Sequence, residues 1–234
     1  MSDDEARKRD SALTMPARES SGPVPILFQD EHLLVVDKPA RMLVVPAPGR
    51  HRPTVVDRVG DQLGSRVFAV HRLDEDTTGA LVLARTVEAR QALEEIFRKH
   101  LAERLYLALT VRTPSPAAGC IESRMRETSA GIMESVESGP AERAVTHYRV
   151  LARRGRHCLV ECRLETGRRN QIRVHMAEIG CPIVGDRKYG DRSRGYRRPM
   201  LHAFRICFEH PLGGDDVAIE IPPAEHDLAP PPGA

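Results

Sequence analysis

One stretch of this sequence, His71-Arg72-Leu73-Asp74, places a carboxylate where it could do chemistry. The pattern from Val67 to Asp74 predicts a β-strand that enters a turn at residues 75–79, EDTTG. Alternation along a strand would put Arg72 and Asp74 on one face. Active sites often use residues at such strand ends. Spacing alone nevertheless favours two ordinary interpretations, a surface Arg–Asp ion pair or an aspartate that begins a turn.

Metal and nucleotide sites have their own sequence patterns, and the sequence lacks them. Cys158 and Cys162 are four residues apart in a strand-like run, and there is neither a CxxC pair nor an HExxH pattern. Glycine-rich phosphate-binding loops are also missing from the sequence. We therefore expect no metal and no cofactor, so that side chains alone carry any chemistry.

Composition limits the class of protein. The chain has 234 residues, of which 41% are hydrophobic and 29% charged, and this suits one large domain or two small ones rather than a disordered chain. No apolar run of about 18 residues and no signal-peptide pattern is present. The five cysteines are an odd number, which favours reduced thiols. We expect a cytoplasmic protein without a membrane partner, and nothing demands more than a monomer.

Charge is unevenly distributed along the chain. The formal net charge is only +2, yet residues 143–205 contain 16 basic and 5 acidic residues, a net charge of +11. Only four of the 35 basic residues are lysines, and the arginine fork suits phosphate oxygens and base edges. A high-GC genome would explain the arginine excess equally well, but not its clustering. This segment predicts binding to a nucleic acid.

The predicted organisation is one domain between two tails. Residues 1–22 are polar and charged, and residues 223–234 are rich in proline, so neither end can bury enough apolar surface to fold. No internal repeat or second core is evident, which leaves residues 23–222 as a single domain. Residues 112–143 are predicted to be loops with a short hairpin.

Strands predominate in this domain. The hydrophobic patterns predict strands at 26–28, 33–36, 67–74, 80–84, 105–111, 145–151, 158–164, 200–208 and 217–221. Within 105–111, alternation turns Tyr106 away from the layer of Leu105, Leu107, Leu109 and Val111. Because no βαβ alternation appears, we predict an α+β fold, with a mixed, mainly antiparallel sheet flanked by helices.

Three helices are predicted from their caps. Thr54 and Asp57 resemble a capping box, and Gly64 ends that helix. Thr86 caps a longer helix whose apolar stripe includes Ala89, Leu93, Phe97 and Leu101, which we assign to the core. Asn170 is expected to cap a short helix that Gly180 ends.

Several motifs, in order, resemble those of the RluA family of RNA pseudouridine synthases. They are residues 71–79 (HRLDEDTTG, for HRLDxxTSG), 104–106 (RLY, for basic-x-Tyr), 166–175 (TGRRNQIRVH, for TGRxHQIRVH), 180–190 (GCPIVGDRKYG, for GxPIxGDxxYG) and 201–203 (LHA). The similarity extends from about residue 26 to residue 221. Thr78 replaces the usual serine and Asn170 the usual histidine, while Arg41 stands where glycine is common. The ordered set is far more specific than any single motif.

The resemblance implies a cofactor-free isomerisation of uridine and a pseudouridine synthase-like fold. Asp74 would be the essential catalytic group, able to attack ribose C1′, abstract a ribose proton or add to C6 of the base. Arg173 would keep this carboxylate charged and oriented. Tyr106 would stack near the base, and it could remove the C5 proton, although a tyrosine of ordinary pKa is a poor base.

The implied substrate is a structured RNA, a stem-loop of ribosomal or transfer RNA, from which the uridine must leave its stack. Arg72 resembles the arginine that fills the gap left by the flipped base. Further basic residues are candidates for contacts to the RNA backbone. They are Arg168, Arg169, Arg187, Lys188, Arg192, Arg194, Arg197 and Arg198. The 22 residues before Pro23 are too few for an S4-type RNA-binding domain, so we expect the catalytic domain to select the RNA.

Two other functions remain open at this point. A non-catalytic RNA-binding protein would keep the basic surface, but it would not need Asp74, Tyr106 and Arg173 together. A hydrolase could pair Asp74 with Glu75 or Asp76 as acid and base, and it would release free uracil from RNA.

Overall fold

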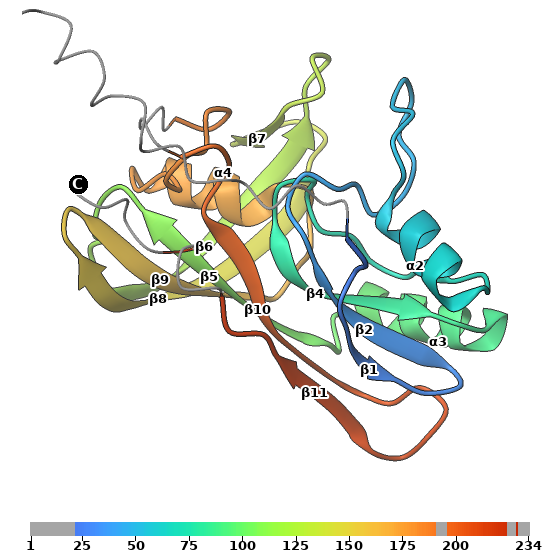
Figure 1. Ribbon diagram of the computed structural model, residues 1–234. Helices are drawn as coiled ribbons and strands as arrows, with labels where there is room; N and C mark the ends of the chain where they lie inside the picture. The colour runs from blue at the N-terminus through green and yellow to red at the C-terminus, as the bar shows by residue number, and fades with distance from the viewer. Residues whose placement is uncertain (1–21, 191–195, 224–227, 229–234) are drawn as a thin grey trace, which may run out of the picture.

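One mixed sheet organises the molecule, in a computed structural model that describes residues 22–190, 196–223 and 228 (Figure 1). Its strands are β1 (Ile26–Gln29), β2 (Leu33–Lys38), β3 (Phe68–Ala69), β4 (Thr78–Ala84), β5 (Glu103–Thr110), β6 (Ala118–Glu127), β7 (Met133–Val136), β8 (Glu142–Arg154), β9 (His157–Leu164), β10 (Leu201–Glu209) and β11 (Asp216–Glu220). The described helices are α2 (Val55–Leu63), α3 (Val87–Arg98) and α4 (Gln171–Glu178). The predicted α+β class is confirmed.

The strand order is β1-β2-β4-β10-β5-β9-β8-β6-β7, with β11 on β10 and β3 on β4. Within the described sheet, β10 and β4 form the one parallel pair, through His202 with Thr78 and Ala203 with Gly79. Gly79 has φ +105°, and a Cβ there would lie 2.2 Å from the carbonyl oxygen of Ala203. Glycine therefore allows these two strands to approach. The Thr78 hydroxyl bonds His202 Nδ1 at 2.8 Å.

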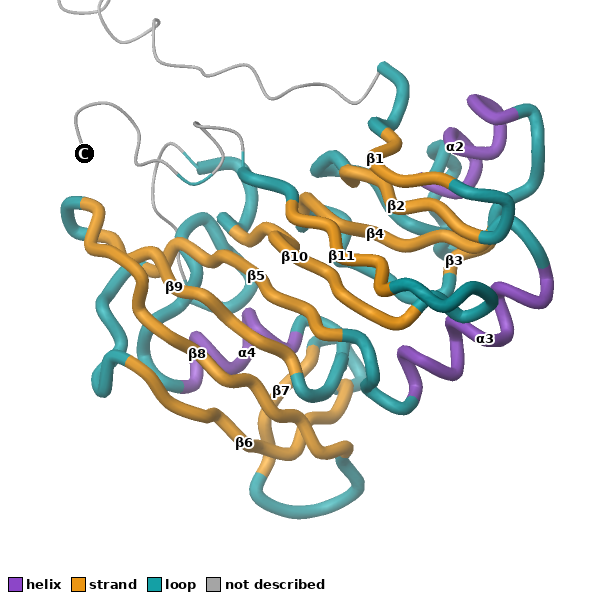
Figure 2. Tube along the Cα trace, turned by 90° about the horizontal axis from the view of Figure 1, so that it is seen from below, coloured by secondary structure: helices purple, strands orange, loops and turns teal. Residues whose placement is uncertain are grey.

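Helices α2 and α3 cover opposite faces of the β2–β4 pair. Leu34 and Leu81 lie in the same core cluster as Val59 of α2, whereas Val35 and Val82 pack in a second cluster that contains Leu93 of α3. Figure 2 shows α3 beside the half of the sheet that contains β4, and α4 against the half that contains β8 and β9. The sheet is thus buried on both faces where α2 and α3 cover it.

The two predicted longer helices are confirmed, with one correction. Thr54 and Asp57 form a full capping box on α2, and Gly64 ends the helix in the left-handed conformation. The Thr86 hydroxyl caps α3 by accepting from the backbone N–H of Ala89. Leu101 does not extend the apolar stripe, because α3 ends at Arg98 and Leu101 is 66% exposed.

The predicted strand 67–74 is mostly wrong. Pairing between β3 and β4 covers only two residues, Phe68 with Ala84 and Ala69 with Leu83. Further along, β2 pairs with one edge of β4, and β10 pairs with β4 at Thr78 and Gly79. With both edges engaged, the chain from 70 to 77 leaves the sheet as a loop. Arg72 and Asp74 therefore do not share a strand face.

Residues 112–143 hold more structure than the sequence predicted. They contain β6, which is ten residues long, together with β7 and the start of β8. The predicted division into a domain and two tails remains a prediction, since residues 1–21, 224–227 and 229–234 lie outside the described residues. Leu228, which falls in the second predicted tail, is buried in the main core cluster.

Candidate active site

A cavity of about 570 Å³ lies where the loop 70–77, the end of α3, β5 and the segment before α4 converge. Asp74, Tyr106 and Arg173 all line it, together with the rim arginines Arg72 and Arg168. Its volume lies within the range of small-molecule sites. The structure thus brings the three predicted catalytic residues to one cavity, although 99 positions separate Asp74 from Arg173 in the sequence.

Lys38 anchors the loop that carries Asp74. Its side chain is fully buried at the end of β2, and Nζ donates to the carbonyl oxygens of Pro39, Glu75 and Thr77, each at 2.9 Å. Burial lowers the pKa of Lys38 to about 7, against the opposing charges of Asp76 and Asp74. The sequence analysis treated Lys38 only as the end of a strand, and the anchoring role depends on carbonyls nearly 40 residues away.

Arg41 explains a departure from the family pattern. It has φ +60°, in the left-handed region that glycine adopts most easily, so the family's usual glycine fits this backbone without strain. The next residue, Met42, donates its N–H to the carbonyl oxygen of Glu75 at 3.2 Å. The turn at Arg41 therefore supports the same loop as Lys38.

Arg173, in the first turn of α4, connects two carboxylates. Nη1 donates to Asp74 Oδ2 at 3.1 Å, while Nε and Nη2 donate to the two oxygens of Asp186 at 2.6 and 2.8 Å. The Asp186 side chain is fully buried, and the Arg173 side chain is 11% exposed. The bidentate contact fixes the plane of the guanidinium, so that one N–H points at Asp74.

The electrostatics of this pair keep Arg173 charged and leave Asp74 an available oxygen. Burial lowers the pKa of Arg173, but the hydrogen bonds and charges of Asp186 and Asp74 outweigh burial and raise the pKa above its ordinary value. Asp74, whose side chain is 19% exposed, uses only Oδ2 in this contact. Among the described residues its Oδ1 has no hydrogen-bond partner. That oxygen can meet a substrate.

Asn170 supports Arg173 rather than capping α4. Its backbone is left-handed, with φ +56°, and its side chain makes no capping hydrogen bond. Instead Oδ1 accepts from Arg173 Nη1 at 3.0 Å, and Nδ2 donates to the Tyr189 hydroxyl at 3.0 Å. The Tyr189 ring lies 5.1 Å from the Arg173 guanidinium. The predicted cap is therefore wrong, because tertiary partners engage the side chain.

Tyr106 is buried on β5 and lines the cavity, although its neighbours Leu107, Ala108 and Leu109 are also buried. Burial raises the pKa of Tyr106 to about 12, with Arg104 lowering it and Asp74 raising it. The hydroxyl therefore keeps its proton at neutral pH, which makes the phenolate scarcer than for an ordinary tyrosine.

The predicted RNA-contacting residues lie in different settings. Arg72 and Arg187 are exposed, and Arg72 lies at the cavity. Arg168 pairs with Glu142, and Arg169 pairs with Glu127. Lys188 Nζ lies 5.6 Å from the Tyr189 ring.

The other basic candidates divide in two. Arg198 is buried and donates to the carbonyls of Pro199 and Leu201, so it does not face RNA as predicted. Arg197 is exposed, whereas Arg192 and Arg194 fall outside the described residues.

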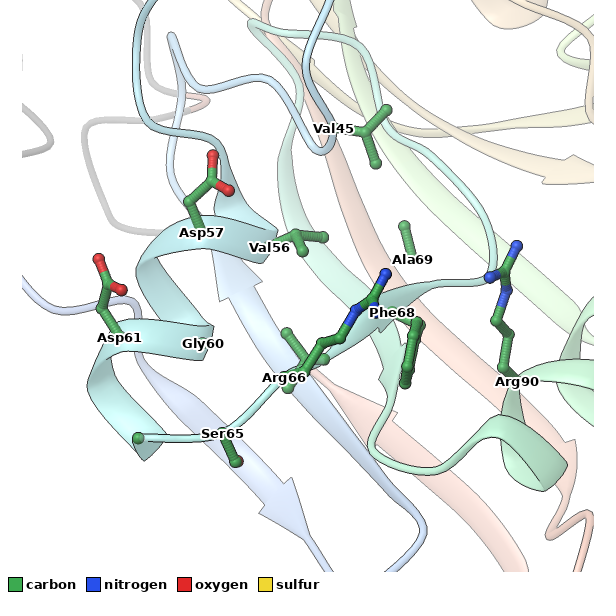
Figure 3. Close-up of a pocket in the computed structure, with 12 residues that line it drawn as sticks. Val45, Val56, Asp57, Gly60, Asp61, Ser65, Arg66, Phe68, Ala69 and Arg90 are labelled. Atoms are coloured by element: carbon green, nitrogen blue, oxygen red, sulfur yellow. The ribbon is translucent and has the colours of Figure 1, made fainter.

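A larger cavity of about 840 Å³ lies between α2, β3 and the start of α3 (Figure 3). Its charged lining residues are Asp57, Asp61, Arg66 and Arg90, all of them exposed. Both guanidinium groups lie near the Phe68 ring, at 4.9 Å for Arg66 and 5.7 Å for Arg90. This cavity holds none of the predicted site residues.

Two site residues lay inside quoted motifs without an assigned role. Asp186 belongs to the segment 180–190, and only its contact with Arg173 distinguishes it from a turn aspartate. Arg104 precedes Tyr106 by two positions and lines the same cavity with a buried guanidinium. The signal available in the sequence was the basic-x-Tyr spacing, since alternation along a strand puts both side chains on one face.

In the described part of the chain, no helix is long and apolar enough to cross a membrane. The same residues include no group of three or more His, Cys, Asp or Glu side chains placed to hold a metal ion.

Comparison with known proteins is consistent along most of the chain. A family model described as RNA pseudouridylate synthase matches residues 32–178. Ribosomal large subunit pseudouridine synthase D of Zymomonas mobilis is 39% identical, covering 89% of this chain and 72% of that protein. The protein of the same name from Xylella fastidiosa is 37% identical, covering 88% and 67%. The structure of human RNA pseudouridylate synthase domain containing 4 superposes with a TM-score of 0.73 at 27% identity, covering 87% of this chain and 90% of that one. The chain therefore belongs to the RNA pseudouridylate synthase family and is an isomerase of that class.

Proposed function

We propose that this chain isomerises a uridine in a stem-loop of large-subunit ribosomal RNA, with Asp74 as the catalytic carboxylate. One observation carries the proposal: Arg173 holds Asp74 Oδ2 at 3.1 Å in a cavity that Tyr106 also lines. The names of the relatives from Zymomonas and Xylella support the large ribosomal subunit as the source of the RNA.

The chemistry follows from the free oxygen of Asp74. Isomerisation breaks the bond between ribose C1′ and uracil N1, turns the base, and joins C1′ to C5. A carboxylate at the sugar can attack C1′ or abstract a ribose proton, and both routes place Asp74 Oδ1 against the ribose. Arg173 keeps the carboxylate oriented, and Asp186 and Asn170 hold Arg173 in place.

Tyr106 acts as a platform for the base in this proposal. Its ring lines the cavity, and because its pKa is raised to about 12 its hydroxyl stays protonated at neutral pH. A protonated hydroxyl cannot take the proton from C5. Tyr106 therefore stacks against the base, and another acceptor receives that proton.

Basic residues at the cavity rim offset the cost of extruding the uridine, which is on the order of a few kcal/mol. Arg72 lies exposed at the cavity and fills the gap left by the base. Arg168 and Arg169 are paired with exposed glutamates, and RNA phosphates would replace Glu142 and Glu127 as partners. Arg187 and Lys188 extend this backbone-binding surface.

The test maps pseudouridines in total RNA from cells with and without the gene, by carbodiimide modification and primer extension. We expect one or more positions of large-subunit RNA to lose the signal on deletion, and the wild-type gene to restore them. Asp74→Asn should fail to restore any position, because an amide neither attacks C1′ nor accepts a proton, yet it should bind the RNA.

Asp61→Asn is the matched control, since it makes the same change in the larger cavity, and it should restore the signal. Loss confined to transfer RNA would overturn the assignment to ribosomal RNA. Full restoration by Asp74→Asn would overturn the role of Asp74.

A further inference from the structure

Arg104 carries a buried positive charge that the described protein leaves without a partner. The residue is 7% exposed on β5 and lines the cavity of Asp74. Its Nε and Nη2 have no hydrogen-bond acceptor, and among the described residues it forms no salt bridge. Burial lowers its pKa, which Tyr106 partly opposes. Burying an unpaired charge costs several kcal/mol by order of magnitude, so a ligand is the natural source of the missing acceptor.

The backbone around Arg104 makes room for this guanidinium. Gly167, at the other wall of the cavity, has no side chain, and a Cβ there would lie 2.6 Å from Arg104 Nη1. Arg104 and Tyr106 are two positions apart on β5, so their side chains share a face. The guanidinium therefore lies at the Tyr106 side of the cavity, where the base stacks in the proposed function.

The position favours the base over a phosphate as the ligand. Phosphates remain on the RNA strand, where exposed arginines such as Arg72 can reach them. A buried guanidinium deep in the cavity instead faces the flat group that enters it. Uracil offers the carbonyl oxygens O2 and O4, which accept N–H donors.

We propose that Arg104 is a catalytic residue that donates to a uracil carbonyl oxygen and stabilises the negative charge that the base acquires. When C1′–N1 breaks, the electron pair of that bond leaves with N1, and the charge spreads over the ring to O2 and O4. C5 then uses this electron pair to form the bond to C1′. Loss of the C5 proton and gain of one at N1 complete the isomerisation. The negative charge thus moves from Asp74 to the base and back out of the site.

This inference rests on the proposed use of Asp74, and the two fail differently. If the wild-type protein leaves its RNA unmodified, or if Asp74→Asn is active, the proposed function fails. If the wild type is active, Asp74→Asn is inactive and Arg104→Ala is unaffected, only the inference fails.

The experiment measures single-turnover rates at saturating RNA, RNA affinity at several salt concentrations, and thermal unfolding. Arg104→Ala should lower the saturating rate by about 10²-fold or more, as does loss of a donor to a developing oxyanion, with RNA affinity within about twofold. Guanidinium ion, added well below concentrations that unfold the protein, should restore part of the rate. Urea, which has the same shape without the charge, should not.

Arg98→Ala is the matched control, because Arg98 lines the same cavity but is exposed and paired with Glu95. It should keep its rate and ignore guanidinium. Weaker RNA binding by Arg104→Ala with a smaller salt slope and an unchanged saturating rate would overturn the proposal in favour of a phosphate contact. A lost rate that guanidinium does not restore would overturn it in favour of a structural role.

Gly167→Ala gives a second measurement that does not remove the charge. The added methyl displaces the Arg104 guanidinium, so it should lower the saturating rate in the wild-type background. In the Arg104→Ala background it should have no further effect. An equal loss in both backgrounds would contradict the proposal.

Discussion

The two cavities of this protein differ in the opposite sense from their sizes. The larger one, of about 840 Å³, is lined by two aspartates and two arginines that are all exposed to water. The smaller one, of about 570 Å³, buries Arg104 and most of Arg173 beside Asp74. Solvent satisfies charges in the larger cavity, whereas the smaller cavity must satisfy them with fixed partners or with a ligand.

That difference shows which property marks a site. In the larger cavity Asp57 caps α2, and Arg66 and Arg90 lie near Phe68, so each group has an ordinary structural use. In the smaller cavity, Asp74 keeps a free oxygen and Arg104 lacks a partner among the described residues. Uncompensated buried charge, rather than volume, distinguishes a site that reacts from one that merely holds water.

The largest expected effect comes from Asp186→Asn. Without the bidentate carboxylate, Arg173 is free to turn both N–H groups towards Asp74 and to block its reactive oxygen. A displacement of this kind costs about 10²-fold in rate, which single-turnover kinetics at saturating RNA would measure. Asp57→Asn in the larger cavity is the control and should weaken only the helix cap. A wild-type rate in Asp186→Asn would remove the contrast between the cavities.

Tyr106→Phe should have a smaller effect. Because burial raises the pKa of Tyr106 to about 12, its hydroxyl keeps its proton, and the variant should stay within about tenfold of the wild-type rate, below the usual contribution of a general base. Tyr106→Ala should lose more, since it removes the ring. The wild-type rate should not rise between pH 8 and 10 through this residue. A rise that the Phe variant abolishes would identify the phenolate as the base.

The protonation of two buried histidines sharpens the comparison through stability. Burial lowers the pKa of His71, at the smaller cavity, to about 3, with Arg104 adding to the effect, and burial lowers that of His175 to about 4. Since both values lie below the ordinary pKa, the unfolded chain binds more protons below pH 6.5, and the free energy of unfolding falls as pH decreases. The loss at pH 5 is about 2 kcal/mol per histidine.

Urea unfolding at pH 7 and pH 5 measures this dependence. His175→Gln should remove about half of it. An unfolding free energy that stays constant between the two pH values would contradict the burial of these rings.

The smallest effect is expected in the larger cavity. The double variant Arg66→Gln, Arg90→Gln removes both guanidinium groups near Phe68, and it should lower the free energy of unfolding by about 1 kcal/mol. The saturating rate should remain within about twofold of wild type. A strong loss of rate would show that the larger cavity belongs to the catalytic machinery, and the distinction drawn between the two cavities would be wrong.

Local elements were predictable where neighbouring residues satisfy one another. The capping box of α2 joins Thr54 and Asp57 within one turn, so no distant residue is needed to form it. The short loop of 70–77 was not predictable, because it depends on β10 pairing with the edge of β4. Asn170 illustrates the same limit, since its side chain bonds Tyr189 and Arg173 instead of the helix end.

By itself the sequence determined the fold class, the family and the identity of Asp74, Tyr106 and Arg173 as candidates, because alternation and ordered motifs depend on residue type and spacing. Only the tertiary structure decided what each of these groups faces: the anchoring of the Asp74 loop by Lys38, the clamp of Asp186 on Arg173, and the isolation of Arg104. The reason is physical. Desolvation and the choice of hydrogen-bond partner depend on atoms that lie far apart along the chain and meet only in the folded molecule.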